Sequence, residues 1–359
     1  MRTHQIFVST LLATAGLCAQ APEKKAVEGM PNPKTEHHAA LKQYVGTWTV
    51  SGRMEAMPGV PGMEKAMDSQ GHEHAELLCD GLWLKWESEM TCAGQRSTGL
   101  WLVGYDPFQK QYVSYVVSSD DHCPGLTPLT GTYDKKTETW TWVGESPQGK
   151  MKSVCKFSGA DKLTETLYMV GPDGKEKQFM VMERTRSKEA RPTKLMNASV
   201  KAKPDAKLPV HAAAVTQDVG TWNAVVESEY AGQKTTDKGT EHVHAICDNR
   251  WAWSVFRCQF MGQPFSGYGL LGWDATQKKY AGLWIDSMSP TFTVTTGTRD
   301  KKTGTYTLTG TSTGPDGKPM KIEQKLTREG KDQRVLNMKL DAGEMKSTMK
   351  ITYTRRKAK

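Results

Sequence analysis

The sequence lacks the long apolar segments that a membrane-spanning helix requires. Beyond the N-terminus, no apolar run in the 359-residue chain approaches the roughly 18 residues needed to cross a bilayer as a helix. Hydrophobic residues make up 37% of the chain and aromatic residues 8%, which is enough to form buried cores. A chain of this length suits two domains of about 150 residues each. We therefore expect two globular domains and no integral membrane segment in the mature chain.

The sequence also lacks the short motifs of common enzyme classes. It contains no phosphate-binding loop, Cys-x-x-Cys or His-Glu-x-x-His, and each of these would point to a particular chemistry. The net charge of +9 gathers in the segment 184–207 and in the tail Arg355–Lys359, away from the aromatic residues. Nucleic-acid-binding surfaces interleave the two kinds of residue. The composition therefore indicates no nucleic-acid partner, no cofactor and no evident enzymatic activity.

The N-terminus has the features of an export signal. Arg2 precedes the apolar stretch Ile6–Ala19, which is too short to span a membrane and ends in small residues suited to cleavage. Six cysteines follow this segment, and their spacing does not determine any disulfide pairing. We expect residues 1–19 to be a signal peptide, residues 20–35 a disordered arm, and the mature protein to be exported to the periplasm or the cell exterior.

The rest of the chain is a tandem repeat. The letters VGTW occur at Val45–Trp48 and again at Val219–Trp222, and the alignment extends through most of both halves. The matching segments are Cys79–Met90 with Cys247–Cys258, Leu102–Ser119 with Leu270–Ser287, and Gly131–Trp142 with Gly297–Leu308; upstream, His38 matches His211 after one residue of slack. We predict domains at 36–187 and 210–356, joined by a basic linker over 188–209 that is rich in Lys, Ala and Pro.

Within each repeat the pattern is that of short β-strands. Polar and apolar residues alternate, as in Thr137–Trp142, and turn residues recur about every ten positions. The only helical pattern is the short segment Glu36–Tyr44 before the first VGTW. A series of hairpin-connected strands closes most naturally into a barrel, because closure removes exposed edges. The sequence predicts an all-β fold of two tandem up-and-down antiparallel β-barrels of about ten strands each, each preceded by a short helix.

These residues resemble a known family. A short helix, a Gly-x-Trp first strand and a β-meander are similar to the calycin superfamily of lipocalin-like barrels, and the VGTW start, the central hairpin and the terminal Tyr-x-Arg resemble the bacterial family of unknown function DUF1579. The second repeat fits its hairpin pattern through Gly272–Asp274, Lys278–Tyr280, Trp284 and Asp286–Ser287. The first repeat departs from it, with Val116 and Ser118 in place of Trp284 and Asp286. The resemblance implies a lipocalin- or nitrobindin-like fold and almost no chemistry.

Side chains that alternate toward the barrel interior would line any pocket. By strand parity these ligand-binding candidates are Trp86, Met90, Trp140 and Trp142 in the first repeat, and Phe256, Phe260, Tyr306 and Leu308 in the second. Trp284 and Asp286 are added because the first repeat has Val116 and Ser118 at their positions. A barrel of eight or more strands can hold one small ligand, or its side chains can fill the interior. The main hypothesis is an exported, non-enzymatic protein that binds a small apolar ligand, with the second repeat as the better candidate.

Two other functions stay open. His242 and His244 lie two residues apart, so on a strand they share a face and could bind a metal together with further ligands. A metal- or haem-binding protein, or a barrel enzyme that uses these histidines with Asp286, is therefore the first alternative. The second is an envelope protein-interaction module whose loops contact a partner. The sequence does not indicate the oligomeric state.

Overall fold

The structure is a computed structural model. It describes residues 33–59, 63–146, 149–189, 210–230, 233–260, 262–314, 317–343 and 345–357. The predicted signal peptide, most of the predicted arm and nearly all of the predicted linker lie outside these residues. Among the described residues, no helix is both long enough and apolar enough to cross a membrane.

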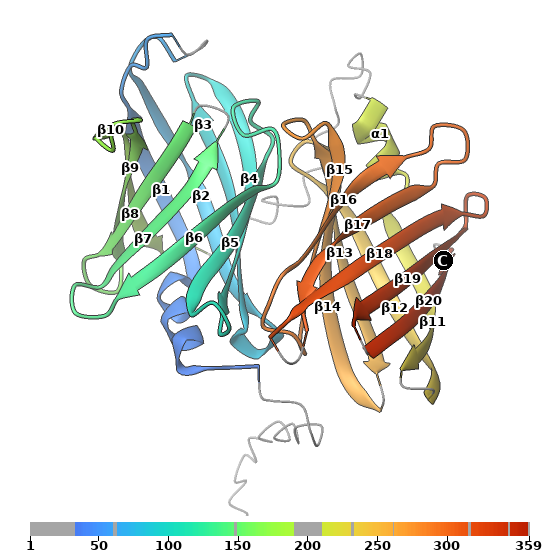
Figure 1. The fold of residues 1–359 in the computed structure, drawn as a ribbon. Coiled ribbons are helices and arrows are strands. Elements are labelled where there is room, and N and C mark those ends of the chain that lie inside the picture. Colours follow the sequence, from blue (N-terminus) through green and yellow to red (C-terminus); the bar gives the residue numbers. More distant parts are fainter. Residues whose placement is uncertain are drawn as a thin grey trace, which may run out of the picture. The chain divides into compact units, whose positions relative to one another are not determined.

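Each repeat folds into ten strands (Figure 1). The first repeat begins with a 3₁₀ helix, η1 (Glu36–Tyr44), and has a second short one, η2 (Cys79–Gly81). Its strands are β1 (Gly46–Met54), β2 (Met67–Leu78), β3 (Trp83–Cys92), β4 (Gln95–Asp106), β5 (Gln111–Ser118), β6 (Thr127–Asp134), β7 (Thr139–Ser146), β8 (Gly149–Phe157), β9 (Lys162–Val170) and β10 (Glu176–Ser187).

The second repeat begins with helix α1 (Val210–Thr216). Its strands are β11 (Gly220–Tyr230), β12 (Gln233–Ile246), β13 (Trp251–Phe260), β14 (Gln263–Asp274), β15 (Lys279–Asp286), β16 (Thr293–Arg299), β17 (Tyr306–Thr313), β18 (Pro319–Arg328), β19 (Gln333–Ala342) and β20 (Met345–Arg355).

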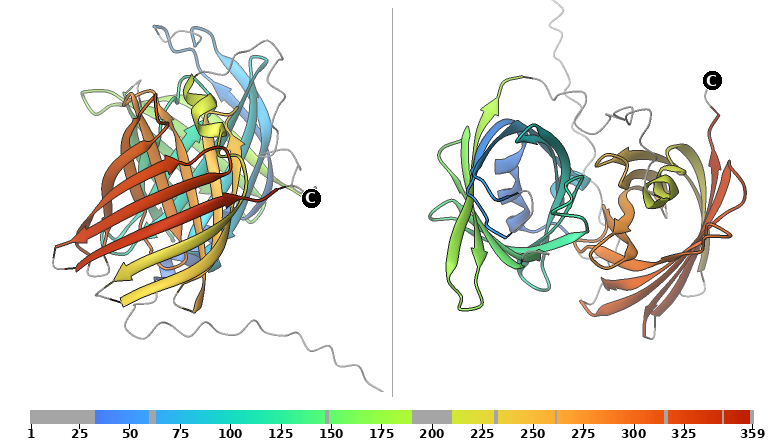
Figure 2. Two further views of the ribbon diagram at one scale, coloured as in Figure 1. Left: turned by 90° about the vertical axis from the view of Figure 1, so that its right-hand side faces the viewer. Right: turned by 90° about the horizontal axis from the view of Figure 1, so that it is seen from above.

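Both sheets close on themselves. Every strand pairs antiparallel with its neighbours in sequence, and the first strand of each repeat pairs with the last, β1 with β10 and β11 with β20. In the end-on view of Figure 2 each sheet forms a ring, with a short helix lying across its lumen. The predicted fold of two tandem ten-stranded up-and-down barrels is confirmed.

The VGTW motif closes one end of each barrel. The Trp48 and Trp222 side chains are fully buried, and each indole N–H donates to the carbonyl of the residue four positions earlier, at 2.9 and 2.8 Å. An arginine of the last strand covers each indole at 4.1 Å from the ring, Arg186 over Trp48 and Arg355 over Trp222. This pairing explains why the repeats agree at their beginnings and at their ends.

The glycine before each tryptophan has a definite steric reason. Gly46 has φ +133° and Gly220 has φ +135°, a backbone conformation that L side chains rarely adopt. A Cβ on either residue would also collide with the guanidinium of Arg186 or Arg355. These guanidinium groups donate to the Val45 and Val219 carbonyls, one residue before each glycine.

Residues 33–359 form one compact unit, and one apolar cluster contains residues from both repeats. The Trp83 indole donates to the Asp286 carbonyl at 2.9 Å, and its ring lies 4.6 Å from the Phe292 ring. Arg96 also contacts Asp248 across the repeats, at 3.3 Å. The outer faces of β3 and β13 are therefore partly covered, although their alternating pattern is that of strands with one wet face.

Candidate ligand-binding site in the second barrel

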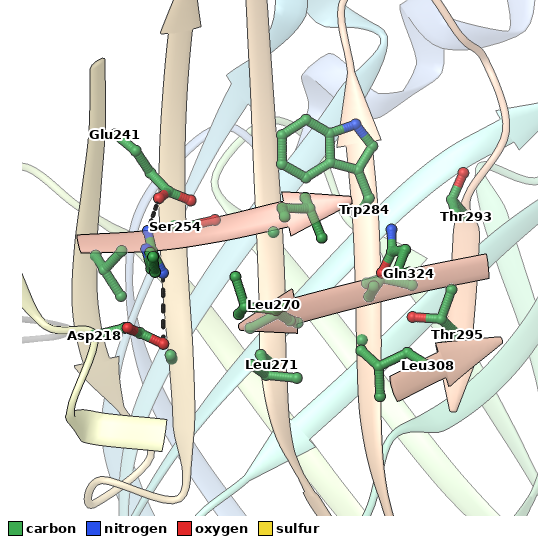
Figure 3. A pocket seen from close by; sticks show the side chains of 18 of the residues that line it. Asp218, Glu241, Ser254, Leu270, Leu271, Trp284, Thr293, Thr295, Leu308 and Gln324 are labelled. Carbon is green, nitrogen blue, oxygen red and sulfur yellow. Dashed lines mark hydrogen bonds and ion pairs between the residues drawn. The ribbon is translucent and has the colours of Figure 1, made fainter. Parts of the chain in front are cut away.

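A cavity of about 140 Å³ lies inside the second barrel (Figure 3). Its polar lining residues are Asp218, Glu241, Ser254, Thr293, Thr295, Gln324, Arg334 and Tyr353, and its apolar side chains include Val243, Leu271, Trp284, Leu308, Leu326 and Leu336. The two carboxylates lie on one side of the cavity, and Trp284, Thr295 and Leu308 lie on the other. The cavity therefore has a charged end and an uncharged end, where Thr293 and Gln324 also lie.

At four positions around the cavity, large aromatic residues of the first repeat have smaller counterparts in the second. Trp86 pairs with Trp101 between β3 and β4, whereas Ser254 pairs with Gly269 at the equivalent place between β13 and β14. Tyr44, two residues before Gly46, corresponds to Asp218, two residues before Gly220. Trp142, opposite Gly131, corresponds to Leu308, opposite Gly297. Four large rings are thus replaced by smaller side chains.

At the same level, the first barrel is filled by rings. The Tyr44 ring lies 5.0 Å from the Trp86 ring and 5.2 Å from the Phe157 ring. Trp101 lies 5.6 Å from Trp86 and 5.0 Å from Trp142. Offset and edge-to-face contacts at these distances are favourable packing arrangements for aromatic rings. The interior of the first barrel is therefore a packed aromatic core at the position where the second barrel has its cavity.

The charged end of the cavity consists of buried ion pairs. Arg334 of β19 contacts Glu241 of β12 and lies 3.5 Å from Asp218, while Arg328 of β18 contacts the same Asp218 Oδ2 atom at 2.7 Å. The side chains of Asp218, Glu241 and Arg334 are each 8% exposed or less. Burial raises the pKa of Glu241, and Arg334 opposes this shift. Two carboxylates and two guanidinium groups leave this end with no net charge.

The first barrel has a related cluster of buried charges, in which the arginine stands on a different strand. Arg184 of β10 binds Glu73 through two hydrogen bonds of 2.6 and 3.1 Å, and lies 2.9 Å from Glu165. Glu73 and Glu241 occupy equivalent positions, opposite the motif residues Trp48 and Trp222. The arginine comes from the last strand in one barrel and from the strand before it in the other. The buried glutamate is thus common to both repeats, whereas the arginine that pairs with it stands on a different strand in each barrel.

Some polar atoms at the cavity have no partner within the protein. Among the described residues, Asp218 Oδ1 and Arg334 Nε are buried and form no hydrogen bond. Buried polar atoms are normally hydrogen-bonded, because leaving one unpaired costs roughly 1–3 kcal/mol. Both residues line the cavity, and their unpaired atoms are a carboxylate oxygen that can accept a hydrogen bond and an arginine N–H that can donate one.

Trp284 and Asp286, predicted from the sequence, lie at different distances from this site. Trp284 lines the cavity. Asp286 accepts hydrogen bonds from the Trp284 indole at 3.0 Å and from the backbone N–H groups of Met288 and Ser289 at 2.8 Å each. Burial raises the pKa of the Asp286 carboxyl. These contacts hold the loop after β15 and orient the indole, so Asp286 supports the cavity wall.

The other sequence candidates lie around the cavity or in the other barrel. Trp86, Trp140 and Trp142 belong to the aromatic core of the first barrel, and Met90 is half-buried farther along β3. Phe256 packs in the apolar cluster beside Trp284, and Phe260 is half-buried 6.0 Å from the Phe265 ring. Tyr306 is fully buried beneath α1 and donates to the Ala214 carbonyl at 3.0 Å.

His242 and His244 lie on the exposed side of β12. Both residues are exposed, and His242 Nδ1 lies 3.1 Å from the Thr221 hydroxyl. In the described part of the chain, no three His, Cys, Asp or Glu side chains gather closely enough to hold a metal ion. The proposed pair therefore has no third ligand there.

The charged residues of the cavity were not among the sequence candidates. One signal was present, because the position before each VGTW is Tyr44 in one repeat and Asp218 in the other. The sequence alignment also paired His211 with His38, which is one residue out of register. In the structure His37 stacks on Tyr105, and His211 stacks on the equivalent residue, Trp273. With this register the upstream helices align without slack, and the exchange of Tyr44 for Asp218 is evident.

The architecture defines this protein as a tandem lipocalin-like barrel protein, in which one barrel has an aromatic core at the level where the other has a cavity. The chain belongs to the family described as "Protein of unknown function (DUF1579)", which matches residues 32–186 and again residues 209–355. No curated protein matches the chain.

Several solved structures are similar in fold. One is the S-type phycobiliprotein lyase CPES from Guillardia theta, with 12% identity over 40% of this chain and 90% of that chain and a TM-score of 0.32. Another is Rv2717c from M. tuberculosis, with 12% identity over 43% and 99% and a TM-score of 0.33. A redesigned β-barrel, mFAP0, bound to DFHBI, has 16% identity over 39% and 99% and a TM-score of 0.23. At these values the comparisons carry no argument about function.

Proposed function

We propose that this is an exported protein that binds one small, predominantly apolar ligand inside its second barrel. The observation that carries the proposal is the cavity of about 140 Å³ at the level where the first barrel is filled by four aromatic rings. The lining combines apolar walls with a few convergent polar groups, which is the usual composition of a small-molecule site. The first barrel, with its packed aromatic core, acts as a structural partner.

The volume limits the ligand. Pockets for drug-sized molecules measure about 300–1,000 Å³, so a haem or another large cofactor does not fit this cavity. An engineered protein cavity of about 150 Å³ binds benzene. The ligand is therefore a compact molecule of about that size.

The test measures binding of fluorobenzene to the full chain by ¹⁹F NMR. In the wild-type protein we expect a saturable change in linewidth or shift. The Leu308→Trp variant should abolish it, because the indole occupies the cavity; the fold accepts tryptophan here, since Trp142 lies opposite Gly131 as Leu308 lies opposite Gly297.

The matched control is Thr309→Trp, which places the same side chain on the exposed face of the same strand. It should bind fluorobenzene like the wild type. Absence of binding to the wild type, or equal binding to the Leu308→Trp variant, would reject the proposal.

Export is tested separately. In fractionated cells that express the full chain, we expect the mature protein outside the cytoplasm with Gln20 as its first residue, as the cleavage pattern after Ala19 predicts. A cytoplasmic chain that retains residues 1–19 would contradict this part of the proposal.

A further inference from the structure

The charged end of the cavity indicates which polar group the ligand carries. Asp218 Oδ2 forms ion pairs with Arg328 and Arg334, whereas Asp218 Oδ1 has no hydrogen-bond partner among the described residues. The Asp218 side chain is only 3% exposed, so bulk water does not compensate this oxygen. A ligand group that donates a hydrogen bond would satisfy it.

The net charge of the surrounding side chains favours an uncharged hydrogen-bond donor on the ligand. The carboxylates of Asp218 and Glu241 are matched by the guanidinium groups of Arg328 and Arg334. An ammonium or a carboxylate on the ligand would add an unbalanced charge to a buried site, which is costly. A neutral ligand avoids this cost.

A second unpartnered atom, Arg334 Nε, indicates which functional group the ligand has. Arg334 Nε is buried without a hydrogen-bond acceptor among the described residues, and Arg334 lines the same cavity as Asp218. A hydroxyl group both donates and accepts hydrogen bonds. It can donate to Asp218 Oδ1 and still offer its oxygen to a neighbouring N–H.

The opposite wall suits an apolar ring. Trp284 and Leu308 line this part of the cavity, together with the uncharged side chains of Thr293, Thr295 and Gln324. The Trp284 indole is held in place by its hydrogen bond to Asp286. Figure 3 shows Trp284 and Leu308 across the cavity from the carboxylates. The polar group of a bound molecule would thus lie at one end and its apolar body at the other.

We infer that the ligand of the second barrel is a neutral, compact aromatic alcohol of the phenol type, whose hydroxyl donates to Asp218 while its ring lies against Trp284. This inference rests on the proposed function, since it names the ligand class of the same cavity. It differs from purely apolar binding in requiring the hydroxyl.

The test compares phenol with fluorobenzene, which has a similar shape but cannot donate a hydrogen bond. With the full chain and ¹⁹F-observed competition, phenol should bind at least about tenfold more tightly than fluorobenzene, because only phenol can donate a hydrogen bond to the charged Asp218. Benzylammonium and benzoate should each bind more weakly than phenol. No variant is needed for this comparison.

The Asp218→Asn variant tests the residue assignment. It should reduce the ratio of phenol affinity to fluorobenzene affinity, because the amide of asparagine is a weaker hydrogen-bond acceptor than the carboxylate. Because the ratio is measured within one protein preparation, a general loss of stability does not imitate the effect. The Leu308→Trp variant should bind neither compound.

The outcomes separate this inference from the proposed function. Equal affinity for phenol and fluorobenzene, or tighter binding of benzylammonium or benzoate, overturns the aromatic-alcohol assignment and leaves the cavity as a binding site. An unchanged ratio in Asp218→Asn overturns the role of that residue. If neither compound binds the wild-type chain, the proposed function fails as well.

Discussion

The two barrels share a frame and differ in their interiors. Both have a buried tryptophan that is covered by an arginine of the last strand and whose indole N–H donates to the carbonyl four residues earlier. Inside, one barrel contains Tyr44, Trp86, Trp101 and Trp142, and the other contains Asp218, Ser254, Gly269 and Leu308. The comparison shows that closure of this fold does not depend on a filled interior at this level.

The difference also shows where a site can arise in a duplicated chain. Residues that close the barrel are the same in both copies, whereas residues that fill the lumen have diverged. Large aromatic side chains contribute strongly to core stability through buried area, so their loss from the second barrel has a cost. Buried ion pairs there are poor substitutes, because desolvation offsets much of their attraction. An interior of this kind is more readily explained by ligand binding than by stability.

The largest expected effect comes from the buried charges. Arg184→Met should lower the free energy of unfolding by about 3–5 kcal/mol, because it leaves the buried Glu73 and the half-buried Glu165 without their cation. Urea denaturation followed by tryptophan fluorescence measures the change. The control Arg53→Met removes an exposed ion pair with Asp68 and should change stability by less than about 1 kcal/mol. Similar losses in the two variants would contradict the buried cluster.

The next prediction transfers the cavity between barrels. Trp142→Leu places in the first barrel the residue that the second barrel has at Leu308, and it should cost roughly 3 kcal/mol through lost contacts and the space that remains. In a chain that also contains Leu308→Trp, fluorobenzene binding should return, now in the first barrel. We would measure it by ¹⁹F NMR and measure stability by urea denaturation. A stable double variant that binds nothing would show that the aromatic rings do not account for the difference.

A smaller effect tests the shared frame. Gly46→Ala and Gly220→Ala should each destabilise the chain by about 1–3 kcal/mol, because a side chain at these φ values is strained and its Cβ meets an arginine. Thermal and urea unfolding should show comparable losses for the two variants. Gly94→Ala is the control, since Gly94 also has positive φ but open space around its Cβ. If it cost as much as the other two, the arginine contact would be irrelevant.

The smallest effect is a pH dependence. His38 is 1% exposed, and burial is the main reason that its pKa lies below the ordinary value of 6.5. The unfolded chain therefore takes up this proton at a higher pH than the folded chain. Stability should fall as pH decreases through about 6.5 toward the lower folded pKa. In His38→Gln, where the glutamine can keep the helix cap, the curve between about pH 5 and 7.5 should be flatter; identical curves would contradict the prediction.

Much of the architecture could be predicted from the sequence, for a local reason. Alternation of polar and apolar residues, turn residues and the two VGTW motifs are short-range patterns, and they predicted two ten-stranded barrels with short preceding helices. Strand parity also placed Leu308 toward the interior, and the difference between the repeats singled out Trp284; both line the cavity. The charged end was missed because Asp218, Glu241 and Arg334 come from three separate segments that meet only when the sheet closes.

What the sequence determined by itself is the repeat, the strand periodicity and the position of each barrel's closing tryptophan, because these depend on neighbours in the chain. Only the tertiary structure decided which barrel is filled. Whether Trp86 and Trp101 fill a lumen, or Ser254 and Gly269 leave one open, depends on how side chains from opposite strands meet across the barrel. Side chains of opposite strands meet only after the sheet has closed into a barrel, and this closure depends on all ten strands.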